Sequence, residues 1–129
     1  MKFIVNRSKK MQNVVVEKSL EFAIRVVKLF QFLEREKKEF VLSKQLLRSG
    51  TSIGANIREA IQGFSKKDFT AKMSVALKEA SETEYWLEIL YKTDYLSVKE
   101  YESIMADCAE LNKILISIVK QSRESGQGK

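Results

Sequence analysis

Histidine and proline are both missing from this sequence of 129 residues, and glycine occurs only five times. Proline ends helices, and folds rich in strands need many turn residues. A chain that is poor in both is therefore expected to be mostly helical. Hydrophobic residues make up 44% and charged residues 31%, which is typical of a globular protein and not of a disordered one. We expect a single domain over residues 1–129, long enough to bury a core.

The absence of histidine bears directly on chemistry. It removes the commonest metal ligand, the commonest general base and every nucleophile that works with a histidine partner. Enzymes can use carboxylates or lysine instead, but the expectation of catalysis falls. We therefore predict a protein that is not an enzyme, with no catalytic residue, no cofactor, no metal site and no small-molecule substrate.

Cys108 is the one cysteine, so no disulfide can form within the chain. It lies among Met105, Leu111 and Leu115 at helical spacing, which predicts a small buried apolar residue in preference to a reactive thiol. No stretch approaches the roughly 20 apolar residues of a membrane span, and the first residues hold no apolar run long enough for a secretory signal. We expect a cytoplasmic protein that does not bind membranes.

Hydrophobic spacing predicts four helices with no internal repeat. They are expected from about Val14 to Glu36, from about Phe40 to Ile61, from Ser65 to the turn around Asp94–Leu96, and from about Val98 to Ser122. Residues 1–13 and 123–129 are expected to be flexible ends. Four helices with short connections predict an all-α fold, an antiparallel up-down-up-down four-helix bundle.

Three helix boundaries carry recognisable signals. Gly63 is expected to end the second helix. Ser65 with Asp68 three residues later resembles a capping box, with aspartate in place of the usual glutamate. Ser97 with Glu100 forms a true capping box for the fourth helix.

The first predicted helix is apolar along two adjacent stripes. One stripe consists of Val16, Leu20, Ala23, Ile24, Val27 and Phe30, and the other of Val15, Phe22, Val26, Leu29 and Leu33. Together they cover roughly 200°, whereas a surface helix needs only about 100° to face one core. Such a helix in a small domain must bury a second face, and this pattern predicts a homo-oligomer.

Gly50 and Gly54 lie four residues apart on the apolar face of the second predicted helix. Each glycine costs about 1 kcal/mol in a helix interior. We expect close approach of a neighbouring helix to offset that cost, because no side chain stands between the two backbones. The alternative is that the stretch RSGTSIG breaks the helix into a loop; we favour the continuous helix.

Polar residues run beside the apolar faces of the second and third helices. Glu79 and Glu82 are one turn apart and share a face. Two carboxylates with an arginine nearby can do acid–base work or bind a metal. We favour a structural network, in which Arg48 or Arg58 pairs with an acid at a helix or subunit contact, because the Glu-x-x-His motif of di-iron bundles is absent. The residues of the predicted network are Asn56, Glu59, Glu79 and Glu82.

The net charge of +6 is spread unevenly. Residues 37–72 hold eight basic and three acidic residues, whereas residues 73–96 hold two basic and five acidic ones. Such asymmetry indicates a polyanion partner or complementary contacts between subunits. A base could stack on Phe64, but a solvated charged face explains the basic residues equally well. The candidate nucleic-acid-binding residues are Lys44, Arg48, Arg58, Lys66, Lys67 and Lys72.

Residues 45–90, QLLRSGTSIGANIREAIQGFSKKDFTAKMSVALKEASETEYWLEIL, resemble the family of 23S rRNA-intervening-sequence proteins. The resemblance rests on the patterns RSGTSIGANIxE, SxxDF and AxxEAxETxYWL. It implies a four-helix bundle that forms a ring-like homopentamer. It also implies that the chain is one of a family of short bacterial proteins, some of which are encoded in insertions within ribosomal RNA genes. No enzyme activity is established for this family. A related branch serves diversity-generating retroelements as a basic accessory protein that engages nucleic acid and a reverse transcriptase.

Two function classes follow from the sequence. The first is an oligomeric module that binds RNA or DNA, or an accessory protein of a ribonucleoprotein. The alternative is a structural hub that binds another protein and has no affinity for nucleic acid. Binding that weakens steeply with salt favours the first class, because neutralised phosphates release counterions.

Overall fold

The computed structural model describes the backbone of residues 2–127 and the side chains of residues 9–125. This part of the chain forms four α-helices and contains no strand. The helices are α1 (Lys2–Arg35), α2 (Leu42–Gln62), α3 (Lys66–Lys92) and α4 (Val98–Gln127). The all-α fold predicted from the sequence is confirmed.

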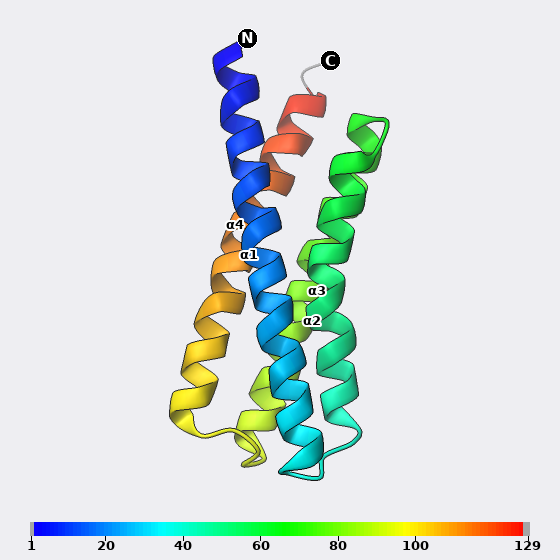
Figure 1. Cartoon of the computed structure of the whole chain (residues 1–129). Helices are drawn as coiled ribbons and strands as arrows, with labels where there is room; N and C mark the ends of the chain where they lie inside the picture. The colour runs from blue at the N-terminus through cyan, green and yellow to red at the C-terminus, as the bar shows by residue number, and fades with distance from the viewer. Residues whose placement is uncertain (1, 128–129) are drawn as a thin grey trace.

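Each helix runs antiparallel to the one before it, which gives the predicted up-down-up-down bundle (Figure 1). α1 and α3 each pack against α2 and α4 as neighbouring helices, whereas the diagonal pairs, α1 with α3 and α2 with α4, are not neighbours among the described residues. The start of α1, the end of α4 and the α2–α3 turn lie at one end, which we call the terminal end (Figure 1). The α1–α2 and α3–α4 connections lie at the opposite end, the loop end.

Two helix boundaries differ from the sequence prediction. α1 begins at Lys2 and not near Val14, and α4 continues to Gln127 and not only to Ser122. The segments predicted as flexible ends are therefore helical as far as the structure describes them; residues 1, 128 and 129 lie outside the described part. Apolar periodicity fades in these segments, but they hold no proline, and lysine, arginine, methionine and glutamine are good helix formers.

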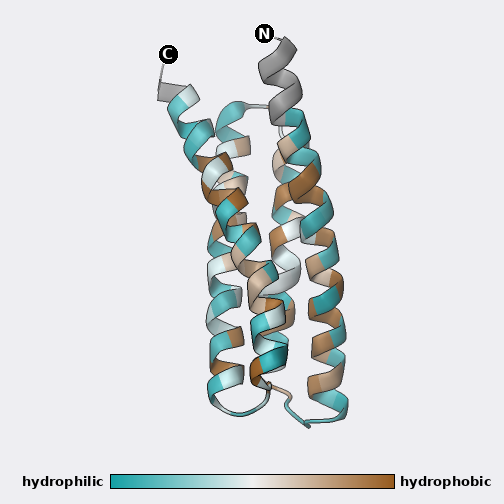
Figure 2. Ribbon diagram, turned by 90° about the vertical axis from the view of Figure 1, so that its left-hand side faces the viewer, coloured by the Kyte–Doolittle hydropathy of each residue, from teal (hydrophilic) through white to brown (hydrophobic). Residues whose placement is uncertain are grey.

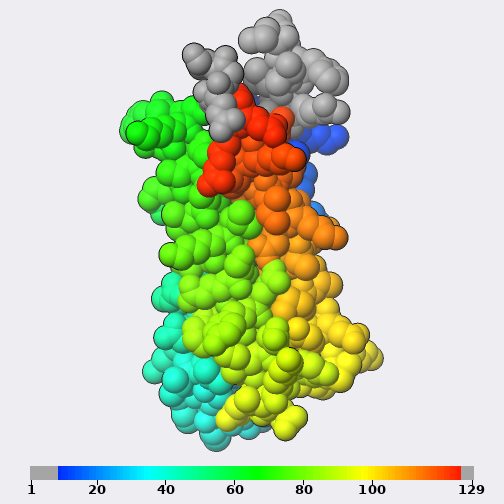
Figure 3. Space-filling model, turned by 180° about the vertical axis from the view of Figure 1, so that it is seen from behind, coloured from blue at the N-terminus to red at the C-terminus, as the bar shows by residue number. Residues whose placement is uncertain are grey.

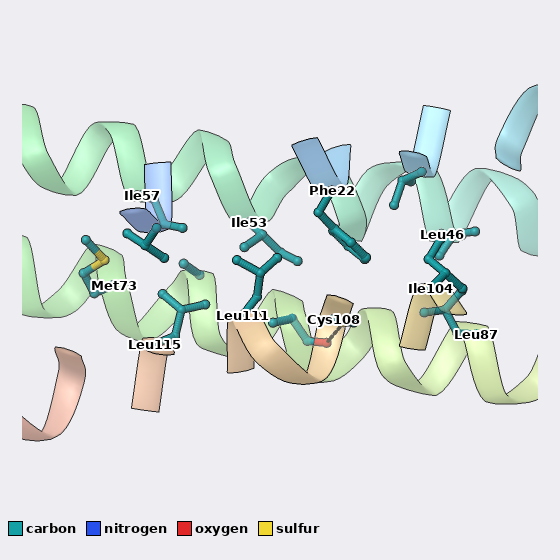
Figure 4. Close-up of a cluster of buried hydrophobic side chains, with 14 of the residues drawn as sticks. Phe22, Leu46, Ile53, Ile57, Met73, Leu87, Ile104, Cys108, Leu111 and Leu115 are labelled. Carbon is teal, nitrogen blue, oxygen red and sulfur yellow. Dashed lines mark hydrogen bonds between the residues drawn. The ribbon is translucent and has the colours of Figure 1, made fainter. Parts of the chain in front are cut away.

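The core lies along the axis of the bundle, where one apolar side of each helix is buried. Ile53 of α2 and Leu111 of α4 point toward one another there (Figure 4). The Cys108 thiol is buried and donates a hydrogen bond to the carbonyl oxygen of Ala80, at 3.5 Å. Burial, followed by the charges of Glu84 and Asp107, raises the pKa of the Cys108 thiol to about 12. The predicted burial of Cys108 is confirmed, and its lack of reactivity stays a prediction.

Serine side chains cap the third and fourth helices. The Ser65 hydroxyl accepts a hydrogen bond from the Asp68 backbone N–H at 3.0 Å. At α4 the capping box is complete, because Glu100 N–H donates to the Ser97 hydroxyl and Ser97 N–H donates to the Glu100 carboxylate. Each pairing satisfies N–H groups that a helix leaves without a backbone partner.

The start of α2 is capped by Glu39, which the sequence reading did not identify. The Glu39 carboxylate accepts hydrogen bonds from the backbone N–H groups of Val41, Leu42 and Ser43, at 3.1, 2.8 and 2.8 Å. Burial acts to raise the pKa of Glu39, but the three backbone hydrogen bonds outweigh it, so this pKa lies below its ordinary value of 4.5. A carboxylate at a helix N-terminus is also favoured by the helix dipole.

The two glycines of α2 lie against α1, and the helix passes through them without a break. A Cβ atom built on Gly50 would lie 2.8 Å from both γ-methyl carbons of Val26. A Cβ atom on Gly54 would lie 3.2 Å from the Ser19 hydroxyl oxygen. The expected close approach of two helices is confirmed, and the alternative of a loop at RSGTSIG is wrong.

Gly50→Ala is expected to destabilise the protein by about 1–3 kcal/mol, the range for overpacking, because its Cβ overlaps the branched side chain of Val26. Combining it with Val26→Ala makes room, so the double variant should lose less stability than the two single variants together. Urea unfolding measures all three variants. Gly54→Ala is the control, because the Ser19 hydroxyl can rotate away. An unchanged unfolding midpoint for Gly50→Ala would contradict the close α1–α2 contact.

Glu39→Gln is expected to lower the free energy of unfolding at neutral pH by about 0.5–2 kcal/mol, the range for a lost helix cap. The folded-state pKa of Glu39 is lowered, so its contribution is present above the unfolded-state pKa and is lost as the pH falls through the folded-state pKa. The difference between wild type and variant should therefore shrink as the pH falls below about 4.5. Urea unfolding at a series of pH values measures it, with the exposed Glu36→Gln as control. Equal effects of the two substitutions would exclude the cap.

Candidate nucleic-acid interface

A cluster of charged residues joins the middle of α2 to α3. The Arg48 guanidinium donates one hydrogen bond to Glu79 at 3.1 Å and another to Glu82. The Trp86 indole N–H also donates to Glu82, at 3.2 Å. Burial acts to raise the pKa of Glu82, but the hydrogen bonds from Arg48 and Trp86 outweigh it and lower the pKa. The positive charge of Arg48 is thus compensated by two carboxylates within the molecule.

The other members of the predicted polar network lie elsewhere. Glu59 of α2 forms an ion pair with Lys72 of α3, at 3.2 Å. The Asn56 amide donates to the Ser52 carbonyl of its own helix at 2.8 Å. The structure therefore brings together Glu79 and Glu82 with Arg48, and it keeps Glu59 and Asn56 apart from them.

The six basic residues proposed from the sequence do not form one patch. Lys44 lies in the first turn of α2 at the loop end, whereas Lys66 and Lys67 begin α3 at the terminal end. The 21 residues of α2, at about 1.5 Å per residue, separate these two positions by roughly 30 Å. Arg48 and Lys72 are engaged in ion pairs. Of the six, only Arg58, Lys66 and Lys67 lie at the terminal end and form no ion pair among the described residues.

The terminal end collects further cations that are distant in sequence. Residues 9–16, 58–72 and 116–125 lie there and hold eight basic and three acidic residues, a net charge of +5. Residues 17–57 and 73–115 hold twelve basic and fourteen acidic residues, a net charge of −2. The bundle is therefore electrically polarised along its axis. The basic residues of the terminal end are Lys9, Lys10, Arg58, Lys66, Lys67, Lys72, Lys120 and Arg123.

A groove of about 640 Å³ runs between the first turns of α3 and the last turns of α4 at this end. Figure 3 shows the α2–α3 turn (green) standing beside the last described turns of α4 (red). Arg123 donates to the Ser74 hydroxyl at 3.4 Å, and Lys66 donates to the Ser125 hydroxyl. The groove is lined by three cations and three hydroxyl groups, those of Lys66, Lys67, Arg123, Thr70, Ser74 and Ser122.

This terminal-end groove has the chemistry to hold an anion. Its three cations form no ion pair with a carboxylate within residues 9–125. The hydroxyl groups already form hydrogen bonds within the molecule, because Thr70 and Ser74 donate to backbone carbonyls and Ser122 bonds to Thr70. The three cations are therefore the donors that remain for phosphate oxygens. Sequence reading missed Arg123 and Lys120, because they lie more than 50 residues from Lys67 and only the bundle topology brings them together.

The exposed face of α1 is the second surface of interest. The stripe of Val15, Val26 and Leu33 is fully buried in the core, whereas Leu20 and Ile24 are 47% and 48% exposed. Figure 2 shows hydrophobic residues on the outer side of α1. The bundle therefore buries most of one predicted stripe, whereas the other is half exposed, with Val16, Ala23 and Phe30 partly buried. Its described exposed members are Leu20, Ile24 and Val27, with Val14 beside them.

A second groove, of about 720 Å³, lies between α1 and α4 toward the loop end. Leu29, Phe32 and Ile104 line it, and at its rim Arg25 donates to Asp107 at 2.6 Å. No group of three or more metal-ligating side chains occurs in the described part of the chain. None of the helices, as far as they are described, is both long and apolar enough to cross a membrane.

Comparison with known proteins gives a consistent result. A family model described as 23S rRNA-intervening sequence protein matches residues 11–117. A crystal structure of a protein with unknown function from the S23 ribosomal protein family of Bacteroides thetaiotaomicron is similar to this chain at 63% identity and a TM-score of 0.84. The match covers 85% of this chain and 98% of that one. Comparison with curated proteins found no match.

Proposed function

The chain belongs to the 23S rRNA-intervening sequence protein family, and we propose that it acts without catalysis, in the cytoplasm, as a self-associating module that binds nucleic acid. The observation that carries the proposal is the charge of the terminal end. A net charge of +5 is concentrated there, while the larger remainder of the bundle carries −2. A polyanion is the partner that such a polarised charge attracts.

Apart from Lys72, the cations of the terminal end are free to meet phosphates. Lys66 and Lys67 are exposed at the start of α3, and neither is neutralised by a carboxylate of the described chain. Arg48 and Lys72, by contrast, already compensate carboxylates, so we assign them no phosphate contact. Each phosphate that a free cation neutralises releases counterions, which gives binding a steep dependence on salt.

Self-association is proposed for the outer stripe of α1. Leu20, Ile24 and Val27 follow one another at helical spacing and are exposed. Burying such a stripe against a second copy removes apolar surface from water, which is the main driving force of association. The family resemblance favours a ring of five copies. In a closed ring each copy contributes its own terminal end, so several weak contacts act together.

A hub that binds protein is the second candidate. One observation favours it: Tyr85 is 59% exposed and stacks edge-on against Trp86, and Trp86 and Arg48 both donate to Glu82 between α2 and α3. Tyrosine, tryptophan and arginine are the residue types that most often dominate protein interfaces. Binding at this cluster would be insensitive to charge changes at the terminal end.

Light scattering of the wild type at micromolar concentration is expected to give a molar mass that corresponds to several copies of the chain. Leu20→Glu with Ile24→Glu should dissociate the assembly into folded monomers, because both side chains are exposed in the single bundle and the change leaves its core intact. Val98→Glu, 52% exposed at the start of α4, is the matched control and should leave the mass unchanged. A wild type that is a stable monomer would rule out the assembly.

Lys66→Glu with Lys67→Glu is expected to weaken RNA or DNA binding at least tenfold. It should also reduce the slope of log affinity against log salt concentration by about two, because two fewer phosphates are neutralised. The oligomer should stay intact. Lys37→Glu with Lys38→Glu makes the same charge change on adjacent lysines at the loop end, so it is the matched control. Fluorescence anisotropy at several salt concentrations measures both.

Two results would count against this assignment. Equal weakening by the two double variants would show that total charge matters and that the terminal end does not. A wild type that fails to bind RNA or DNA even at low salt would exclude nucleic acid and leave the protein-binding hub.

A further inference from the structure

We propose that the terminal end binds single-stranded nucleic acid in preference to a duplex, with a base stacked on Phe64 and the backbone phosphates in the terminal-end groove. This inference rests on the proposed function and specifies its ligand. Three observations carry it: the exposure of Phe64, its position beside the groove, and the chemistry of the groove.

Phe64 is the most exposed large hydrophobic residue of the described chain, at 103% of its reference area. It lies in the turn between Gly63, which ends α2, and Ser65, which caps α3. Its ring therefore stands free of the bundle, on a turn held at both sides by helices. Both faces of the ring are open to a planar partner, and every nucleic-acid base has a face that can stack there.

Phe64 and the groove are close enough to act on one strand. Lys66 follows Phe64 by two residues, so their Cα atoms are at most about 7 Å apart. Lys66 and Lys67 line the groove from α3, and Arg123 faces them from α4. An aromatic ring beside a row of cations is the combination that single-strand-binding surfaces use: bases stack on the ring while the backbone follows the positive charge.

A duplex does not fit this combination. Its bases are stacked on one another, so a ring that stands out from the protein surface reaches none of their faces without unstacking a step, which costs a few kcal/mol. Unstacked bases of a single strand are free to meet the ring. The groove offers the side chains of two lysines and one arginine, which suit phosphate oxygens. Recognition is therefore expected to depend on strandedness and little on sequence.

The acids of this end do not close the groove. Asp68 and Glu124 are both exposed, and neither forms an ion pair with Lys66, Lys67 or Arg123. The backbone N–H of Asp68 is taken by the Ser65 cap. The N–H groups of Lys66 and Lys67, in the first turn of α3, have no partner within the helix and add to the field that an anion meets there.

The test compares one fluorescent RNA of mixed sequence that forms no hairpin with the same RNA annealed to its complement. Fluorescence anisotropy at two or more salt concentrations gives the affinity and the salt dependence for each. The wild type should bind the single strand at least five- to tenfold more tightly, which is the low end of what one stacked base contributes. Arg123→Gln should flatten the salt dependence for the single strand by about one counterion.

Phe64→Ala should weaken single-strand binding by about five- to a hundredfold, leave its salt dependence unchanged and leave duplex binding unchanged. Phe64→Tyr keeps the ring and should restore the affinity. Phe40→Ala removes an exposed ring at the loop end and serves as control. Because Phe64 packs against nothing in the bundle, these variants are expected to fold.

The outcomes separate this inference from the proposed function. If the wild type binds neither probe, nucleic-acid binding itself fails. If it binds both equally and Phe64→Ala changes nothing, the charge of the terminal end acts alone and single-strand recognition is overturned. If Phe64→Ala changes the mass measured by light scattering, the ring belongs to a contact between copies, which also overturns it.

Discussion

Short connections force each helix of this bundle to run against the one before it. With four helices, this constraint places the start of α1, the α2–α3 turn and the end of α4 at the same end (Figure 1). Three segments that are far apart in sequence thereby combine their basic residues, and the net charge of +5 arises there. Most acidic residues of α3 and α4 are left along the rest of the bundle. The bundle is thus polarised because its topology brings together the basic segments of a sequence whose charges are unevenly distributed.

The contact between α1 and α2 decides which face of α1 is available for assembly. Because Gly50 and Gly54 have no side chain, Val26 and Ser19 of α1 fit against them. Helix α1 therefore packs closely on α2 in one orientation about its own axis. That orientation buries the stripe containing Val26 and turns Leu20 and Ile24 outward. A larger residue at Gly50 would displace α1 and change the surface that it offers. Packing inside the bundle and the proposed contact between copies are therefore linked through the same two glycines.

Sequence patterns predicted the second and third helices and the start of the fourth well, because their apolar spacing and the Ser97–Glu100 box are local signals. The start of α1 and the end of α4 were missed, because apolar periodicity fades there. The Glu39 cap was missed, because its carboxylate reaches forward to three N–H groups from a position that no capping pattern specifies. For the candidate site, the local excess of basic residues pointed to Lys66 and Lys67. It also grouped them with Lys44, which lies at the other end of the bundle. Arg123 could not be found from a sequence window, since it reaches the groove only through the fold.

Hydrogen–deuterium exchange with and without saturating single-stranded RNA tests most directly whether nucleic acid binds at the terminal end. Bound RNA should slow amide exchange in the α2–α3 turn and first turns of α3, residues 63–70, and in the last turns of α4, residues 119–125. Exchange in the connections at the loop end, residues 36–41 and 93–97, should stay the same. Protection confined to the loop end, or to the middle of α2 and α3, would contradict the account.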